Sequence, residues 1–248
     1  MEHTLRAIVL RRRDAGESDR RLTVLSEERG LVDVLAKGAR KGGSRLAGCS
    51  EPLAVSVMQI AKGKQREFLT QAQPITSFPG LRGDHDRLAC GLSLAEVVAQ
   101  TTPHERPEAE LFTFLLVALK HIETHEKPLV ALAWALTGLL DVTGHRPSFD
   151  LCAETGAKIV EARPWYSSAA GGYVRESAAI AFSDRLRTRA EVLIGLARLL
   201  DCEEPPPNLK FAGECLGLLR HIWMDIAGRE LPTLDQLMKS IHATANGS

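Results

Sequence analysis

A glycine-rich basic loop is the most chemically suggestive stretch of the chain. From Leu35 to Gly48 the sequence reads LAKGARKGGSRLAG, in which four cations stand among four glycines: Lys37, Arg40, Lys41 and Arg45. Lysine and arginine donate hydrogen bonds to phosphate oxygens. Glycine lets a backbone approach a ligand closely and lets successive N–H groups converge on an anion. The loop is therefore a candidate clamp for a phosphodiester backbone.

Further cations stand at the ends of the predicted strands around this loop. Arg11, Arg12 and Arg13 close one predicted strand, and Arg20 and Arg21 open the next. If these strands are adjacent and antiparallel, the two arginine groups face each other at one rim. Lys62, Lys64 and Arg66 mark a later hairpin tip. We assign phosphate contacts to nine residues: Lys37, Arg40, Lys41, Arg45, Arg11, Arg13, Arg20, Arg21 and Lys64.

The alternative is that these cations only solubilise the strand ends. Five of them could be balanced locally, by Asp14, Glu17, Asp19, Glu27 and Glu28. The net charge favours binding, however: residues 1–80 hold 14 Lys/Arg against 9 Asp/Glu, although the whole chain has 31 of each. The remainder is correspondingly acidic, so contact with a polyanion is expected at one end of the chain. Only two aromatic residues occur in this part, so we expect binding to the backbone, tolerant of sequence and sensitive to salt.

Motifs for enzymatic chemistry are missing from the sequence. It contains no G-x-x-x-x-G-K-[ST], no G-x-G-x-x-G, no H-E-x-x-H and no G-x-S-x-G. The pattern H-x-E at residues 121–123 lacks the P-C-x-x-C that zinc deaminases need. The five cysteines show no C-x-x-C spacing, so neither a disulfide framework nor a cysteine zinc site is indicated. We expect a non-enzymatic protein without cofactors. Because no apolar run is long enough to span a membrane and no secretion signal is evident, we expect it in the cytoplasm, associated with the nucleoid.

The hydrophobic pattern changes period near residue 79. Five short runs rich in Val, Ile, Leu and Thr fill residues 1–79 and predict a small closed five-stranded barrel. From residue 80 the apolar residues recur at helical spacing, which predicts amphipathic helices that pack together. Residues 145–183 lack a clear period and read as an irregular insertion. The expected fold class is α+β: a barrel domain over 1–79, then an α-helical domain over 80–248.

A second group of cations, Arg185, Arg187 and Arg189, belongs to this helical part. Arg185 and Arg189 are four residues apart and could share one helix face. We consider two uses besides simple solvation. The group could form a second DNA contact, or it could line a pocket for an acidic peptide tail.

Several ordered motifs resemble the RecO family of recombination mediators. They are G-E-S-D-R at residues 16–20, E-R-G at 28–30, A-K-G-A-R at 36–40, S-R-L-A-G at 44–48 and the E-P that follows. The resemblance continues through LTQAQPITSFPGLRGDHDRLACGLSLAEVV, ALTGLLDVTGHRPSFDLCAETG and AAGGY. It covers nearly the whole chain and is weakest after about residue 190.

The resemblance implies an N-terminal OB-fold barrel and a non-enzymatic role in DNA repair and recombination. It implies binding to single- and double-stranded DNA and annealing of complementary strands. It also implies two protein partners: RecR, with which the family loads RecA, and the acidic C-terminal tail of single-strand-binding protein (SSB). Rival interpretations are an OB-fold protein that binds RNA and a metal-dependent nuclease. The sequence shows no acidic cluster that would support the nuclease.

One feature departs from the family pattern. Many members carry a four-cysteine zinc module, C-x-x-C followed by G-G-x-x-C-x-x-C, in the region that is irregular here. In this chain the four positions are Cys152, Thr155, Arg175 and Ala178. One thiolate cannot hold a structural zinc ion, which takes four ligands. We expect a degenerate module without metal, held by packing through Trp165, Tyr166 and Tyr173.

Overall fold

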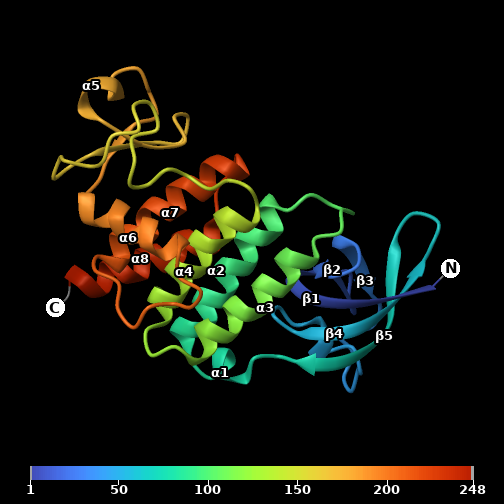
Figure 1. Ribbon diagram of the computed structural model, residues 1–248. Coiled ribbons are helices and arrows are strands. Elements are labelled where there is room, and N and C mark those ends of the chain that lie inside the picture. Colours follow the sequence, from blue (N-terminus) through green and yellow to red (C-terminus); the bar gives the residue numbers. More distant parts are fainter. Residues whose placement is uncertain (1, 247–248) are drawn as a thin grey trace. The chain divides into compact units, whose positions relative to one another are not determined.

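A computed structural model of the chain describes residues 2–246 and is shown in Figure 1. It comprises two compact units, residues 1–123 and residues 124–248. The first unit holds a β-barrel with helices, and the second holds helices with a small sheet. In the described part of the chain, none of the helices combines the length and the apolar character that a bilayer crossing requires.

Five strands form the barrel, as the sequence predicts. They are β1 (Glu2–Ala15), β2 (Asp19–Ser26), β3 (Gly30–Ala36), β4 (Val55–Lys62) and β5 (Glu67–Thr76). The order around the barrel is β1-β2-β3-β5-β4, with β1 closing against β4. All pairs are antiparallel except β3 with β5, which is parallel and short. The closed five-stranded barrel is thus confirmed, and its order is OB-like.

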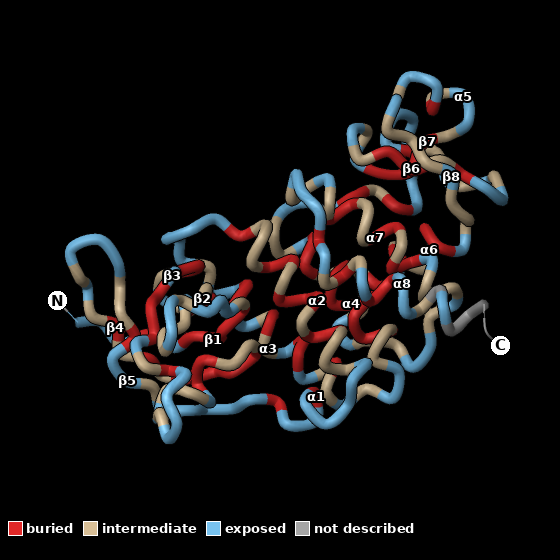
Figure 2. Tube along the Cα trace, turned by 180° about the vertical axis from the view of Figure 1, so that it is seen from behind, coloured by how far each residue is buried: buried red, intermediate tan, exposed pale blue. Residues whose placement is uncertain are grey.

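Alternation along the strands separates an inner from an outer face. Leu22 and Val24 of β2 lie in the barrel core, as do Val32 and Val34 of β3. Their neighbours in sequence therefore point outward. Figure 2 shows the buried stretches of these strands in red. The outward-facing residues are polar at Arg21, Thr23 and Asp33, whereas Leu25, Leu31 and Leu35 are buried apolar side chains.

Three helices complete the first unit: α1 (Pro79–Arg82), α2 (His85–Thr101) and α3 (Ala109–Thr124). The Asp84 side chain caps α2 by accepting a hydrogen bond from the Arg87 amide at 2.9 Å. At Gly91 a Cβ would lie 3.1 Å from Leu53 and 3.4 Å from Leu119, so this glycine lets α2 approach both neighbours closely. The change from strands to helices falls between residues 76 and 79, whereas the compact unit extends to residue 123.

Four longer helices form the core of the second unit. They are α4 (Pro128–Val142), α6 (Ala190–Leu200), α7 (Ala212–Ala227) and α8 (Pro232–Asn246). α4 is apolar nearly all round, and α6 and α7 both pack against it and bury its side chains. Trp223 of α7 is buried and its indole N–H donates to the Leu136 carbonyl at 3.1 Å.

The predicted irregular insertion forms a small sheet with the order β7-β6-β8. Its strands are β6 (Trp165–Ser167), β7 (Gly172–Val174) and β8 (Leu186–Arg187), and the short helix α5 (Glu176–Ala179) follows β7. Tyr166 and Tyr173 are buried, and Tyr166 lies beside Phe149 with ring centroids 6.2 Å apart. We call residues 145–189 the insertion module. Trp165 was also expected to pack there, but it is only half-buried, and it is the first residue of the central strand β6.

Candidate nucleic-acid interface

The outer face of the barrel gathers outward-pointing cations from adjacent strands. Arg13 of β1 pairs in register with Arg21 of β2, and Arg21 pairs with Leu35 of β3. The expected antiparallel arrangement thus brings the two arginine groups together. Lys37 follows two residues after Leu35 and is exposed on the same side. Three neighbouring strands therefore contribute cations to one face.

A groove opens on this face where β3 and β5 separate. The two strands pair only at Val34–Ala36 with Glu67–Leu69. At its other end β3 is contacted by the loop before α3, in which the Glu105 amide donates to the Leu31 carbonyl at 3.0 Å. Between these two contacts the strand edge lines a groove of about 540 Å³. The other walls are Arg21, Arg29, His104 and the hairpin at residues 62–67.

Cations outnumber carboxylates in the groove lining by five to three, and the carboxylates are Asp33, Glu67 and Glu105. The β4–β5 hairpin supplies Lys62, Lys64 and Arg66, and β2 supplies Arg21; all four are exposed. Within the described chain none of these four has a carboxylate at ion-pair distance. The fifth cation, Arg29, is neutralised, because its guanidinium lies 3.0 Å from Glu67 and 3.7 Å from Glu105. Unpaired cations on a concave surface attract anions strongly.

A half-buried aromatic ring lies at the edge of the same face. Phe68 of β5 pairs with Leu35, and the Lys37 ammonium sits 4.5 Å from the ring centroid. A Cβ at Gly63 would lie 2.5 Å from the Phe68 ring, so the hairpin can close over the ring only with glycine there. The ring is a neighbour of the groove and not part of its lining, whose apolar residues are Val32, Val34 and Leu35.

The basic loop is ordered by its own turns and by the β1–β2 connection. The Gly38 amide donates to the Asp19 carboxylate at 2.8 Å, and the Arg40 amide donates to the Ser18 carbonyl at 2.9 Å. The Lys41 and Ser44 amides donate within the loop. Because these donors are used, the loop does not present the row of free N–H groups expected from its glycines. Gly38 and Gly43 instead supply the positive φ values, 66° and 73°, that the turns require.

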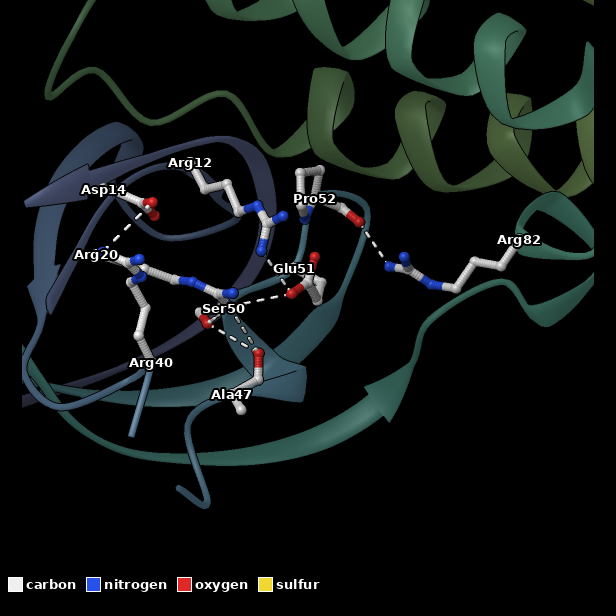
Figure 3. A network of polar contacts seen from close by, with 9 residues as sticks. All are labelled: Arg12, Asp14, Arg20, Arg40, Ala47, Ser50, Glu51, Pro52 and Arg82. Atoms are coloured by element: carbon white, nitrogen blue, oxygen red, sulfur yellow. Dashed lines mark hydrogen bonds and ion pairs between the residues drawn. The ribbon is translucent and has the colours of Figure 1, made fainter. Parts of the chain in front are cut away.

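Two of the predicted phosphate contacts, Arg20 and Arg40, are tied to carboxylates, as is the neighbouring Arg12. Arg12 and Arg20 point toward the end of the barrel and converge on Glu51, at 2.6 Å and 3.0 Å (Figure 3). Arg20 also donates to the Ser50 hydroxyl at 2.6 Å, and its side chain is only 13% exposed. Arg40 lies 3.4 Å from Asp14. Arg20 therefore anchors the loop after β3, while the exposed side chains of Lys41 and Arg45 have no such partner among the described residues.

The second arginine group lies in the insertion module, not on a helix. Arg187 belongs to β8, and Arg189 precedes α6, which begins at Ala190. The expectation that Arg185 and Arg189 share a helix face is therefore wrong, because extended backbone connects them. Arg187 and Arg189 line a pocket of about 470 Å³, whereas Arg185 donates to the Phe182 carbonyl.

The positions of the family's zinc ligands do not fit a zinc ion here. Thr155 and the Arg175 backbone N–H hydrogen-bond the Cys152 sulfur, and they lower its pKa although burial raises it. In the described chain no three His, Cys, Asp or Glu side chains gather for a metal. A hydroxyl, a guanidinium and a methyl group cannot replace three thiolates as structural ligands. Glu161 instead accepts a hydrogen bond from the Tyr173 hydroxyl at 2.6 Å and lies 3.9 Å from Arg175.

Sequence reasoning missed the groove as a single site. It marked Arg21 and Lys64 but did not associate them, because the separation of β3 from β5 is a non-local property of the barrel. It did not mark Arg29 or the loop before α3. The one signal in the sequence was the glycine of the E-R-G turn. In the structure Gly30 has φ 69°, and a Cβ there would lie 1.7 Å from the Arg106 carbonyl oxygen, so this position requires glycine.

Fold and groove together define a class of protein. OB-type barrels use the face of their second and third strands, with the β4–β5 loop, as a ligand surface. Family models described as the N- and C-terminal parts of recombination protein O match residues 1–78 and 82–221. The chain belongs to the RecO family of recombination and DNA repair proteins.

Individual relatives agree with this assignment. The DNA repair protein RecO of Heliobacterium modesticaldum is 40% identical over 172 residues, which are 68% of this chain and 62% of that protein. The RecO protein of Gloeobacter violaceus is 32% identical over 86% of this chain and 82% of its own length. That of an Anaeromyxobacter species is 31% identical over 94% and 96%. The first of these matches thus spans less than two thirds of the relative.

Proposed function

We propose that this protein is a non-enzymatic mediator of DNA repair and recombination that binds DNA along the outer face of its barrel. The observation that carries the proposal is the groove between β3 and β5, in which four exposed cations have no carboxylate partner within the described chain. Lys37, Lys41 and Arg45 extend the cationic surface beyond the groove. DNA phosphates are the ligand that such a surface fits.

The chemistry of the groove suits single strands and, at its exposed rim, duplexes. Arginine and lysine contact phosphates and leave base edges free. The Phe68 ring lies beside the groove, but Lys37 and the hairpin at Gly63 pack against it, so we expect contacts mainly with phosphates. Phosphate contacts of this kind tolerate any sequence and weaken as salt rises.

Strand annealing follows from the same electrostatics. Two complementary strands repel each other through their phosphates, and a cationic surface that holds backbones reduces that repulsion. Because the bases remain accessible, the held strand can pair with a second one. The protein would therefore accelerate annealing without a catalytic residue.

Two protein partners complete the proposal. We propose that the protein acts with RecR to load RecA onto DNA coated by SSB, and that it docks on the acidic tail of SSB. Their contact surfaces are not assigned to residues. The cytoplasm, at the nucleoid, is the compartment in which this role would be exercised.

Annealing of SSB-coated complementary strands, with and without RecR, tests the proposed function. We expect faster annealing with the protein than without it, and a K62Q/K64Q variant with reduced activity. A control variant, K158Q/R198Q, removes the same charge from two exposed positions of the second unit that have no ion pair among the described residues. Equal rates with and without the protein would refute the mediator role. Equal annealing activity of both variants would show that the groove does not contribute to annealing. Stronger binding to RNA than to DNA of equal length would favour an RNA-binding role.

A further inference from the structure

Two partly exposed aromatic rings of the second unit each carry stacked cations. Arg185 and Arg187 lie 5.5 Å and 4.9 Å from the centroid of the Trp165 ring. Arg189 and Lys210 lie 4.9 Å and 5.0 Å from that of Phe211. Both rings are of intermediate exposure, and the polar pocket of about 470 Å³ is lined by two of these arginines.

The pocket itself is rich in nitrogen donors. Its walls include Arg163, Arg187, Arg189 and His221, with a single carboxylate, Glu214. Glu214 lies 2.9 Å from the Arg189 guanidinium. The apolar part of the wall is small and consists of Leu186, Gly217 and Leu218.

A carboxylate fixes the arrangement at Trp165. Glu176 accepts hydrogen bonds from Arg187 at 2.8 Å and from the indole N–H of Trp165 at 2.9 Å. These two bonds lower the pKa of Glu176, that from Arg187 first, so the carboxylate stays charged at neutral pH. The ring and the guanidinium are therefore held side by side before any ligand arrives, which reduces the entropy lost on binding.

We infer that this surface is a second nucleic-acid site, and that it recognises unpaired bases by stacking. The inference rests on the proposed DNA binding of the barrel. Aromatic rings and guanidinium planes both stack on bases. Arg187 and Arg189 are paired with Glu176 and Glu214, so the phosphate contacts are assigned to Arg163 and Lys210, which are exposed and form no ion pair with any described residue. An acidic peptide would also find cations here, but the small apolar wall offers its side chains little to bury against. A chain with one such site in each unit can hold two strands.

The three tryptophans provide a direct readout. Trp134 is 4% exposed and Trp223 is 0% exposed, whereas Trp165 is accessible at the proposed site. A base that stacks on Trp165 should quench its emission, and the two buried indoles should not respond. We expect an oligothymidylate titration of the full chain to quench tryptophan fluorescence, and a blunt duplex of equal charge to leave it unchanged.

Substitutions separate this site from the barrel groove. In a K62Q/K64Q background, W165L should weaken oligothymidylate binding roughly fivefold or more, and R185Q/R187Q should weaken it as well. The K158Q/R198Q control should bind like its parent. Folding of each variant is checked by its near-UV circular dichroism.

Each outcome decides one question. If the wild-type protein binds no oligothymidylate, the proposed function itself fails. If it binds without quenching and W165L changes nothing, the second site is refuted while the groove stands. Equal quenching by duplex would show backbone contact without stacking. Quenching by an oligoglutamate peptide but not by oligothymidylate would assign the surface to an acidic protein partner.

Discussion

The groove on the barrel makes a quantitative prediction about salt. Lys62 and Lys64 are exposed on the β4–β5 hairpin and form no ion pair with any described residue, so each is free to contact a phosphate. For single-stranded DNA log K falls as log salt rises, and each phosphate contact adds about 0.7 to the magnitude of this slope. Removing both lysines should therefore lower the slope by about 1.4.

That change in slope translates into a clear difference in affinity. When salt rises from about 50 to about 200 mM, the K62Q/K64Q variant should lose roughly sevenfold less affinity than the wild type. Fluorescence anisotropy of a labelled oligonucleotide at several salt concentrations measures both slopes. Exposed substitutions of this kind alter stability by only about 0.5 kcal/mol, so folding should not confound the comparison.

The K158Q/R198Q control distinguishes loss of phosphate contacts in the groove from a general effect of net charge. The K158Q/R198Q variant loses the same charge elsewhere, so a uniform effect of net charge would lower its slope equally. We expect its slope to match the wild type. An unchanged slope in K62Q/K64Q, or an equal drop in both variants, would refute the assignment of phosphate contacts to the groove.

Four further predictions concern stability and the insertion module. R20M should lower the free energy of unfolding by about 2 kcal/mol in urea titrations, because it breaks a half-buried charged network; unchanged stability would place Arg20 outside that network. G30A should lower the free energy of unfolding by about 2 kcal/mol or more, because its Cβ would meet the Arg106 carbonyl oxygen at 1.7 Å. G16A, with φ 69° and open space around it, should lower it by only about 1 kcal/mol. Equal losses of stability would contradict the close approach at Gly30. Hydrogen bonds lower the pKa of Glu161 from its ordinary 4.5 and that of Asp184 from 3.8, against the opposing effect of burial. Both carboxylates therefore stabilise the folded module above these pH values and cease to do so as the pH falls below them. E161Q should flatten the acid transition of Trp165 fluorescence. An unaltered transition would show that Glu161 does not contribute to the acid stability of the module. The purified protein should contain no stoichiometric zinc by elemental analysis, and EDTA should leave its melting temperature unchanged; one zinc per chain would overturn the view of a degenerate module.

The sequence alone determined which of the long segments are strands and which are helices, but it did not predict the short strands of the insertion module. Alternating and helical hydrophobic periods separate near residue 79, because side chains on strands and helices repeat with different geometry along the backbone. The strand order could be inferred from the family resemblance. The loss of three zinc ligands could be read directly, since Thr155, Arg175 and Ala178 are not thiolates. These properties are local, or nearly so.

Only the tertiary structure decided which cations are available. Arg20 and Lys64 look alike in the sequence, yet Arg20 is held by Glu51 from a distant loop, whereas Lys64 is exposed on the groove and forms no ion pair with any described residue. Likewise, extended backbone places Arg185 and Arg187 against Trp165, whereas the four-residue spacing had predicted that Arg185 and Arg189 share a helix face. The charge of a side chain follows from its residue type. Its freedom to bind depends on which residues the fold brings beside it, because ion pairing and burial act through space and not along the chain.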